Sequence, residues 1–142
     1  MKTKGIRHAG IITKNPKKMI QFYTEVLNLK KIWDKKENVK DITGYDYECR
    51  TIKMASDNGS QVELIVPPFK APKSISKYLE IGISHTAITV EGIEEIYDRV
   101  EALKCDMLTG YIFENTAGIK IFFCKDPDGN ILELVEDVKK EE

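Results

Sequence analysis

The chain has 142 residues, of which 42% are hydrophobic and 32% are charged, a composition typical of an ordinary globular domain. Its formal net charge of −1 argues against nucleic acid or an anionic membrane surface as a partner. No apolar run approaches the roughly 20 residues that a membrane-spanning helix needs. The N-terminal MKTKGIRHAG lacks the apolar core of a signal peptide, and the three cysteines follow no C-x-x-C spacing, so we expect a cytoplasmic protein with reduced thiols.

The first half of the chain begins with the strand-like run HAGIIT at 8–13. The segment 15–29 then predicts a helix, with Asn15 as a candidate N-cap and Pro16 at the first helical position. Its apolar residues recur on one helical face, at Met19, Ile20, Tyr23, Val26 and Leu27. The turn signal SDNGS joins the last two of three expected strands, which lie at 30–34, 47–55 and 61–66.

The second half repeats this order. The strand-like run HTAITV at 85–90 precedes a predicted helix at 92–104, whose apolar face carries Ile93, Ile96, Tyr97, Val100 and Leu103. The turn signal DPDG joins the last two of three further expected strands, at 106–113, 118–125 and 130–136. Each half therefore reads β-α-β-β-β.

This repeat predicts the organisation of the chain. We expect an α+β fold in which two βαβββ modules form one domain over 1–142. Module 1 spans about 4–66, a Pro- and Lys-rich linker about 67–81, and module 2 about 82–137. Each module is a sheet with a helix on one face, which leaves the other faces to form a shared concave surface.

The two histidines of the chain, His8 and His85, stand at the heads of the first strands of the two halves. Glu63 and Glu133 stand in the middle of the last strands, among aliphatic residues. Because side chains alternate across a strand, both glutamates turn away from the face that packs under the helix, and the histidines follow them.

A strand histidine can also be a hydrogen-bonded structural residue, and a strand glutamate can face solvent on a one-sided sheet. The recurrence of both residue types at repeat-equivalent positions favours a metal site instead. Two imidazoles and two carboxylates suit a borderline divalent ion, and a buried carboxylate among aliphatic residues is costly without a cation. We therefore predict a site formed by His8, Glu63, His85 and Glu133.

The sequence resembles the vicinal oxygen chelate superfamily. This superfamily includes glyoxalase I, methylmalonyl-CoA epimerase, extradiol dioxygenases and the fosfomycin- and bleomycin-resistance proteins. The resemblance rests on "RHAGIITKNPKKMIQFYTEVLNL", "QVELIV", "SHTAITVEGIEEIYDRVEAL" and "KDPDGNILELVE". It implies paired modules that form an open, barrel-like sheet around a cavity with one divalent metal ion, which is Ni, Co, Zn, Mn or Fe. It also implies a homodimer, because in some members the cavity is completed across a subunit interface.

The four ligands together look like the set of glyoxalase I. The epimerase typically has Gln at the position of Glu63, and the dioxygenases and thiol-transferring fosfomycin enzymes use two histidines and one carboxylate. Two departures argue against glutathione: Ile12 stands where the glyoxalases tend to carry Arg, and Pro67 stands near where they carry Asn. The linker looks closer to that of the epimerase, and Asp46 is either its second acidic group or a turn residue.

We therefore expect a metal-dependent, glyoxalase-like lyase or isomerase that chelates a small carbonyl substrate and transfers a proton at the adjacent carbon. By resemblance, Glu133 is the first choice of catalytic base and Glu63 the second. The alternatives are an epimerase, a metal-dependent dioxygenase or thiol transferase on the same fold, and a non-catalytic binding protein. Candidate substrate contacts are Trp33, Tyr45, Tyr47, Arg50, Tyr111 and Phe113.

Overall fold

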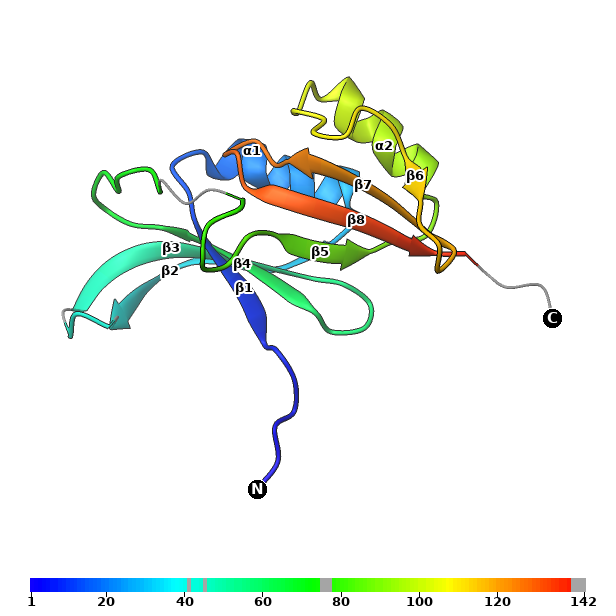
Figure 1. Cartoon of the computed structure of the whole chain (residues 1–142). Coiled ribbons are helices and arrows are strands. Elements are labelled where there is room, and N and C mark those ends of the chain that lie inside the picture. The colour runs from blue at the N-terminus through cyan, green and yellow to red at the C-terminus, as the bar shows by residue number, and fades with distance from the viewer. Residues whose placement is uncertain (41, 45, 75–77, 139–142) are drawn as a thin grey trace. The chain divides into compact units, whose positions relative to one another are not determined.

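The structure is a computed structural model that describes residues 1–40, 42–44, 46–74 and 78–138. It divides the chain into two compact units, Met1–Lys73 and Ser74–Glu142. Each unit contains a four-stranded sheet of mixed direction and a helical segment (Figure 1). No helix among the described residues is long and apolar enough to cross a membrane.

The first unit follows the predicted β-α-β-β-β order. Its elements are β1 (His8–Ile12), α1 (Pro16–Gln21), the π-helical turn η1 (Phe22–Val26), β2 (Lys30–Lys40), β3 (Asp46–Ala55) and β4 (Gln61–Val66). The sheet order is β1-β4-β3-β2, with β1 parallel to β4 and the other pairs antiparallel. Val62 and Leu64 are buried, which confirms the predicted apolar face of β4.

The helix of this unit keeps the expected buried face but changes its geometry midway. Met19, Tyr23 and Val26 are at most 2% exposed, and Phe22, which is not part of the predicted apolar face, is fully buried. The chain passes from α1 into η1 at Phe22, where the hydrogen bonds lengthen by one residue. Pro16 takes the first helical position as predicted, whereas Asn15 makes no side-chain capping hydrogen bond.

The second unit repeats the order with β5 (Thr86–Thr89), α2 (Ile93–Ala102), β6 (Phe113–Glu114), β7 (Ile119–Lys125) and β8 (Ile131–Asp137). Its sheet order is β5-β8-β7-β6, with β5 parallel to β8. Helix α2 lies across β7 and β8, and the rings of Tyr97 and Phe122 meet edge to face at 5.2 Å (Figure 1). Ile93 and Val100 are fully buried from the helix side, and Leu132 and Leu134 from the sheet side.

The prediction of a strand at 106–113 is wrong for most of these residues. Only Phe113 belongs to a strand, and Met107 makes a single isolated bridge to Cys124. Gly110 has φ 69°, a left-handed conformation that interrupts an extended chain. The first unit does the opposite, because its corresponding strand β2 runs well past the predicted end at residue 34, to Lys40.

The α+β class and the two similar βαβββ modules are thus confirmed. The bounds of the modules and of the linker, and the treatment of 1–142 as one domain, stay predictions. Residues 75–77 of the predicted linker and residues 139–142 lie outside the described residues.

Candidate functional site

In the first unit, the parallel pairing of β1 with β4 brings His8 next to Glu63. Gly10, two residues after His8, lies opposite Glu63 in the register. His8 and Glu63 therefore share a face of the sheet, and Nδ1 of the imidazole lies 3.8 Å from Oε2 of the carboxylate. Their side chains are 33% and 16% exposed, so both groups are partly withdrawn from solvent.

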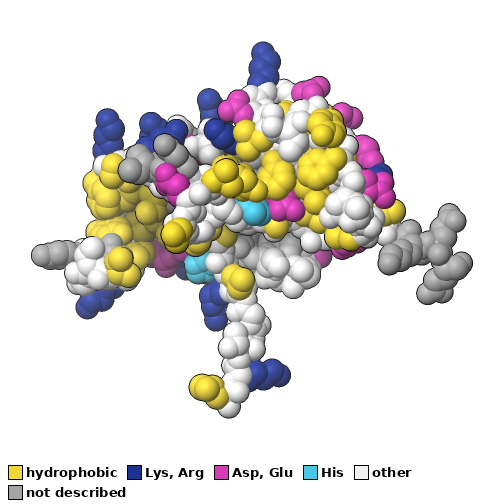
Figure 2. All heavy atoms as spheres, viewed as in Figure 1, with side chains coloured by type: hydrophobic (Ala, Val, Ile, Leu, Met, Phe, Trp, Pro, Cys, Tyr) yellow, Lys and Arg dark blue, Asp and Glu magenta, His cyan; other side chains and the backbone are white. Residues whose placement is uncertain are grey.

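In the second unit, the same register brings His85 next to Glu133. Ala87, two residues after His85, lies opposite Glu133 in the pairing of β5 with β8. Nε2 of His85 lies 2.8 Å from Oε2 of Glu133, and the side chains are 25% and 19% exposed. Figure 2 shows histidine atoms at the surface, as expected for side chains of this partial exposure.

The residue types of both pairs suit a divalent metal ion, and the spacing of the His85–Glu133 pair fits two ligands of one ion. Two ligand atoms bound to one ion at about 2.1 Å and at a right angle to each other are about 3 Å apart, which is close to the separation in the His85–Glu133 pair. Nδ1 of His85 is 2.6 Å from the hydroxyl of Ser84. A hydrogen bond at Nδ1 orients the ring so that Nε2 is the nitrogen that can bind an ion. In the first unit, Nδ1 of His8 is buried and has no hydrogen-bond partner among the described residues.

Each unit by itself supplies two such ligands rather than a complete site. Among the described residues, no three His, Cys, Asp or Glu side chains are grouped in a way that could hold a metal ion. A metal centre of the predicted kind therefore needs the histidine and glutamate of both pairs, and its formation stays a prediction.

Lys53 is a further charged residue in the first unit that the sequence reasoning missed. It lies opposite Glu63 in the pairing of β3 with β4, and its Nζ is 3.4 Å from Oε2 of Glu63. The same Nζ lies 4.3 Å from the ring centroid of Trp33, which is the partner of Lys53 on β2. Only 10% of the Lys53 side chain is exposed, so this ammonium is held by a carboxylate and an aromatic face rather than by water.

Two other polar atoms among the described residues of this unit are buried without a hydrogen-bond partner. Nε1 of Trp33 and Oε1 of Gln61 have no hydrogen-bond partner among the described residues. Gln61 lies opposite His8 in the register, and Trp33 lies opposite Lys53, so the alternation places both on the face that carries Glu63. Because buried donors and acceptors are normally paired, these two atoms make this face a candidate for polar contacts.

Arg50 and Asp46 are less well placed to contact the face that carries Glu63. Arg50 donates two hydrogen bonds of 2.7 Å to the carboxylate of Asp34, which lowers the pKa of Asp34. Arg50 also has the opposite parity to Lys53 along β3, so it is not on the face of Glu63. Asp46 is the exposed first residue of β3 rather than a turn residue. Tyr45 lies outside the described residues.

An apolar pocket adjoins the His85–Glu133 pair. It has a volume of about 450 Å³ and is lined by Tyr78, Leu108, Thr109, Phe123, Lys125 and Ile131. Phe123 lies opposite Glu133 in the sheet, and the rings of Tyr78 and Phe123 are 5.8 and 5.6 Å from that of His85. The aromatic wall of the pocket thus continues onto the predicted ligand. The sequence reasoning missed this wall because Tyr78 comes from the linker.

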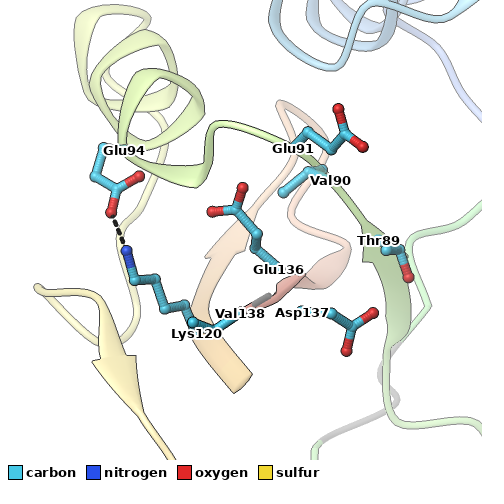
Figure 3. Close-up of a pocket in the computed structure, with 8 residues that line it drawn as sticks. All are labelled: Thr89, Val90, Glu91, Glu94, Lys120, Glu136, Asp137 and Val138. Carbon is cyan, nitrogen blue, oxygen red and sulfur yellow. Dashed lines mark hydrogen bonds and ion pairs between the residues drawn. The ribbon is translucent and has the colours of Figure 1, made fainter. Parts of the chain in front are cut away.

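A second hollow of about 560 Å³ lies beside the start of α2 (Figure 3). Lys120 donates a 2.7 Å hydrogen bond to Glu94 there, which lowers the pKa of Glu94. Glu136 accepts hydrogen bonds from the backbone N–H groups of Gly92 and Ile93 and so caps the helix. Among the described residues that line this hollow there is none of the four predicted ligands, so we assign it a structural role.

The comparisons with known proteins agree with this fold. The chain resembles a glyoxalase family protein from Bacillus cereus, with a TM-score of 0.80 and 19% identity over 98% of this chain and 97% of that one. A lactoylglutathione lyase from Agrobacterium tumefaciens aligns with a TM-score of 0.59 and 17% identity, over 94% of each chain. A fosfomycin resistance protein from Listeria monocytogenes, solved with Mn(II) and a dihydroxypropylphosphonic acid, aligns with a TM-score of 0.61 and 16% identity, over 94% of this chain and 92% of that one.

At these identities the three structures show a shared fold. No curated protein is significantly similar to the chain in sequence. The family model of the Glyoxalase/Bleomycin resistance protein/Dioxygenase superfamily, however, matches residues 5–134. Since this match covers most of the chain, the protein belongs to the Glyoxalase/Bleomycin resistance protein/Dioxygenase superfamily, as its resemblance to the vicinal oxygen chelate proteins implied.

Proposed function

We propose that this protein is a metal-dependent, glyoxalase-like lyase or isomerase acting on a small carbonyl compound. The observation that carries the proposal is the recurrence of one His–Glu pair at the same register in both units, His8 with Glu63 and His85 with Glu133. We propose that these four residues are the ligands of one divalent ion per chain. Ni, Co, Zn, Mn and Fe all suit a donor set of two imidazoles and two carboxylates.

The proposed roles follow from the chemistry of the donors. When bound, a divalent ion would polarise the substrate carbonyl as a Lewis acid. The imidazoles of His8 and His85 would hold it in their neutral form, and Ser84 would fix the ring of His85 through Nδ1. The aromatic wall of Tyr78 and Phe123 would exclude water from the reacting carbon on the side of His85.

Glu133 is the proposed base. On leaving the ion, its carboxylate would take the proton from the carbon next to the carbonyl and return it to the neighbouring carbon, which is an isomerisation. Glu63 is less suited because, besides its histidine, it also forms an ion pair with the Lys53 ammonium. Glu133 instead lies opposite Phe123 on β7, at the edge of the apolar pocket where a substrate carbon would sit.

The test combines metal loading with hydrogen exchange. A thermal-shift screen of small 2-oxo and 2-hydroxy carbonyl compounds selects those that bind, and NMR then follows exchange of their α-hydrogen with solvent deuterium. We expect Glu133→Gln to keep its fold, because the two side chains are nearly isosteric. The exchange should slow by about 10²–10⁴-fold, since an amide cannot accept the proton.

Glu63→Gln is the matched control, since it makes the same chemical change at the equivalent ligand. It should slow the exchange much less. If Glu63→Gln abolishes exchange while metal-loaded Glu133→Gln keeps it, the base belongs to the first unit. If neither variant slows exchange once metal is restored, proton transfer by a ligand carboxylate is wrong, and a dioxygenase or binding role gains support.

A further inference from the structure

We propose that Lys53 makes the site select an anionic substrate, a small 2-oxo or 2-hydroxy carboxylate whose negative charge the Lys53 ammonium balances. This inference rests on the proposed function, because it assigns a substrate class to the same metal site. Lys53 adds a positive charge beside the four proposed ligands and is not one of them.

Lys53 is a buried charge in the sheet of the first unit. The residue is 8% exposed, and lysine is seldom buried to this degree without a counter-charge. Its Nζ lies 3.4 Å from Oε2 of Glu63 and 4.3 Å from the ring centroid of Trp33. Glu63 is therefore the carboxylate that balances the ammonium in the absence of other ligands.

The charges of the metal-loaded site do not cancel. The carboxylates of Glu63 and Glu133 would neutralise one divalent ion, and neutral His8 and His85 would add no charge. Lys53, which is itself 8% exposed, then leaves the loaded site with one positive charge in excess. An excess charge on a buried side chain is costly unless a ligand of opposite sign meets it, and a monoanion restores neutrality.

Apolar and cationic side chains surround the His85–Glu133 pair within the second unit. The apolar pocket beside His85 contains the half-buried Lys125, and no acidic residue is among the described residues that line it. The aromatic side chains of Tyr78 and Phe123 provide flat apolar walls there. Trp33, beside Lys53, adds a buried N–H donor that has no acceptor among the described residues. Around the one ion proposed above, the apolar walls of the second unit would suit a carboxylate that carries an aromatic or other apolar substituent.

The test uses two probes that share a phenyl ring and vicinal oxygens. Phenylglyoxylate is an anion, and its methyl ester is neutral. Calorimetry of the Mn²⁺-loaded protein gives the affinity of each, and the quantity of interest is the ratio of the two affinities. Because the metal itself favours the anion, the ratio is compared between variants rather than read in the wild type alone.

Lys53→Met should lower the preference for the anion by about 10-fold or more, the usual strength of a hydrogen bond to a charged group. Lys53→Arg, which keeps the charge, should largely retain it. Lys35→Met is the matched control: Lys35 also lies 4.3 Å from the Trp33 ring, but it pairs with Glu37 rather than with Glu63. It should leave the preference unchanged. Lys53→Gln replaces Lys53→Met if the latter does not fold.

Metal content, measured on the same samples, separates the two proposals. If the wild type holds the ion and the anion preference is the same in Lys53→Met, the role given to Lys53 is wrong and the metal function stands. If Lys35→Met lowers the preference as much as Lys53→Met, the effect is general charge and the inference is wrong. If the wild type binds no divalent ion, the proposed function is wrong and this inference falls with it.

Discussion

Removal of the Lys53 charge should lower the stability of the metal-free protein and increase the stabilisation that a divalent ion provides. Breaking a fully buried ion pair costs about 3–5 kcal/mol, because the remaining charge is stranded away from water. The Glu63 side chain is 16% exposed and lies 3.8 Å from His8, so the loss of stability should be smaller than for a fully buried pair. We therefore expect Lys53→Met to lower the free energy of unfolding by about 2–3 kcal/mol in the presence of a chelator, a decrease of about 5–10 °C in Tm for a chain of this size.

Binding of a divalent ion should stabilise Lys53→Met more than it stabilises the wild type. In Lys53→Met the ion meets Glu63 without a competing ammonium, so we expect it to bind at least about 10-fold more tightly, which adds about 1.4 kcal/mol of stabilisation at saturation. Urea unfolding with chelator and with excess Mn²⁺, in wild type and variant, measures both effects. Lys35→Met should change neither. The reasoning is refuted if Lys53→Met is as stable as the wild type without metal, or if Mn²⁺ stabilises both proteins equally.

Three further predictions concern the rest of the molecule. Burial raises the pKa of the Cys124 thiol from 9.0 to about 12. Since the thiol of the unfolded chain ionises at a lower pH, the free energy of unfolding should fall by about 1.4 kcal/mol per pH unit above pH 9. Urea unfolding at several pH values should show a smaller decrease in Cys124→Ala. Glu136→Ala removes the carboxylate that caps Gly92 and Ile93 and should cost about 1 kcal/mol in urea unfolding, whereas no loss would show that solvent caps α2 equally well. The protein should sediment as a homodimer, and a monomer at micromolar concentration would contradict that prediction.

The sequence predicted the parts of the fold that depend on local patterns. The repeat of His8 and Glu63 in His85 and Glu133 was visible because strand alternation and the order of elements are written in consecutive residues. Each histidine does lie beside the glutamate of its own unit. Whether the two pairs share an ion stays a prediction.

The contacts of Lys53 could not be predicted in the same way. They depend on which residues of β2, β3 and β4 lie opposite one another, and that register is set by the whole sheet rather than by any one strand. The sequence around Lys53 shows only a lysine in an apolar run. Likewise, the backbone at Gly110 decides that 106–113 is irregular, although its composition suits a strand.

The metal content of the purified protein tests the proposed centre most directly. Elemental analysis of wild type, His8→Ala and His85→Ala, each dialysed against the same divalent ion, gives the number of ions per chain. One shared centre predicts one ion per chain in the wild type and a large loss in both variants, since each removes a ligand from a different unit. A wild type without a bound ion, or variants that both keep it fully, would contradict a centre formed by His8, Glu63, His85 and Glu133.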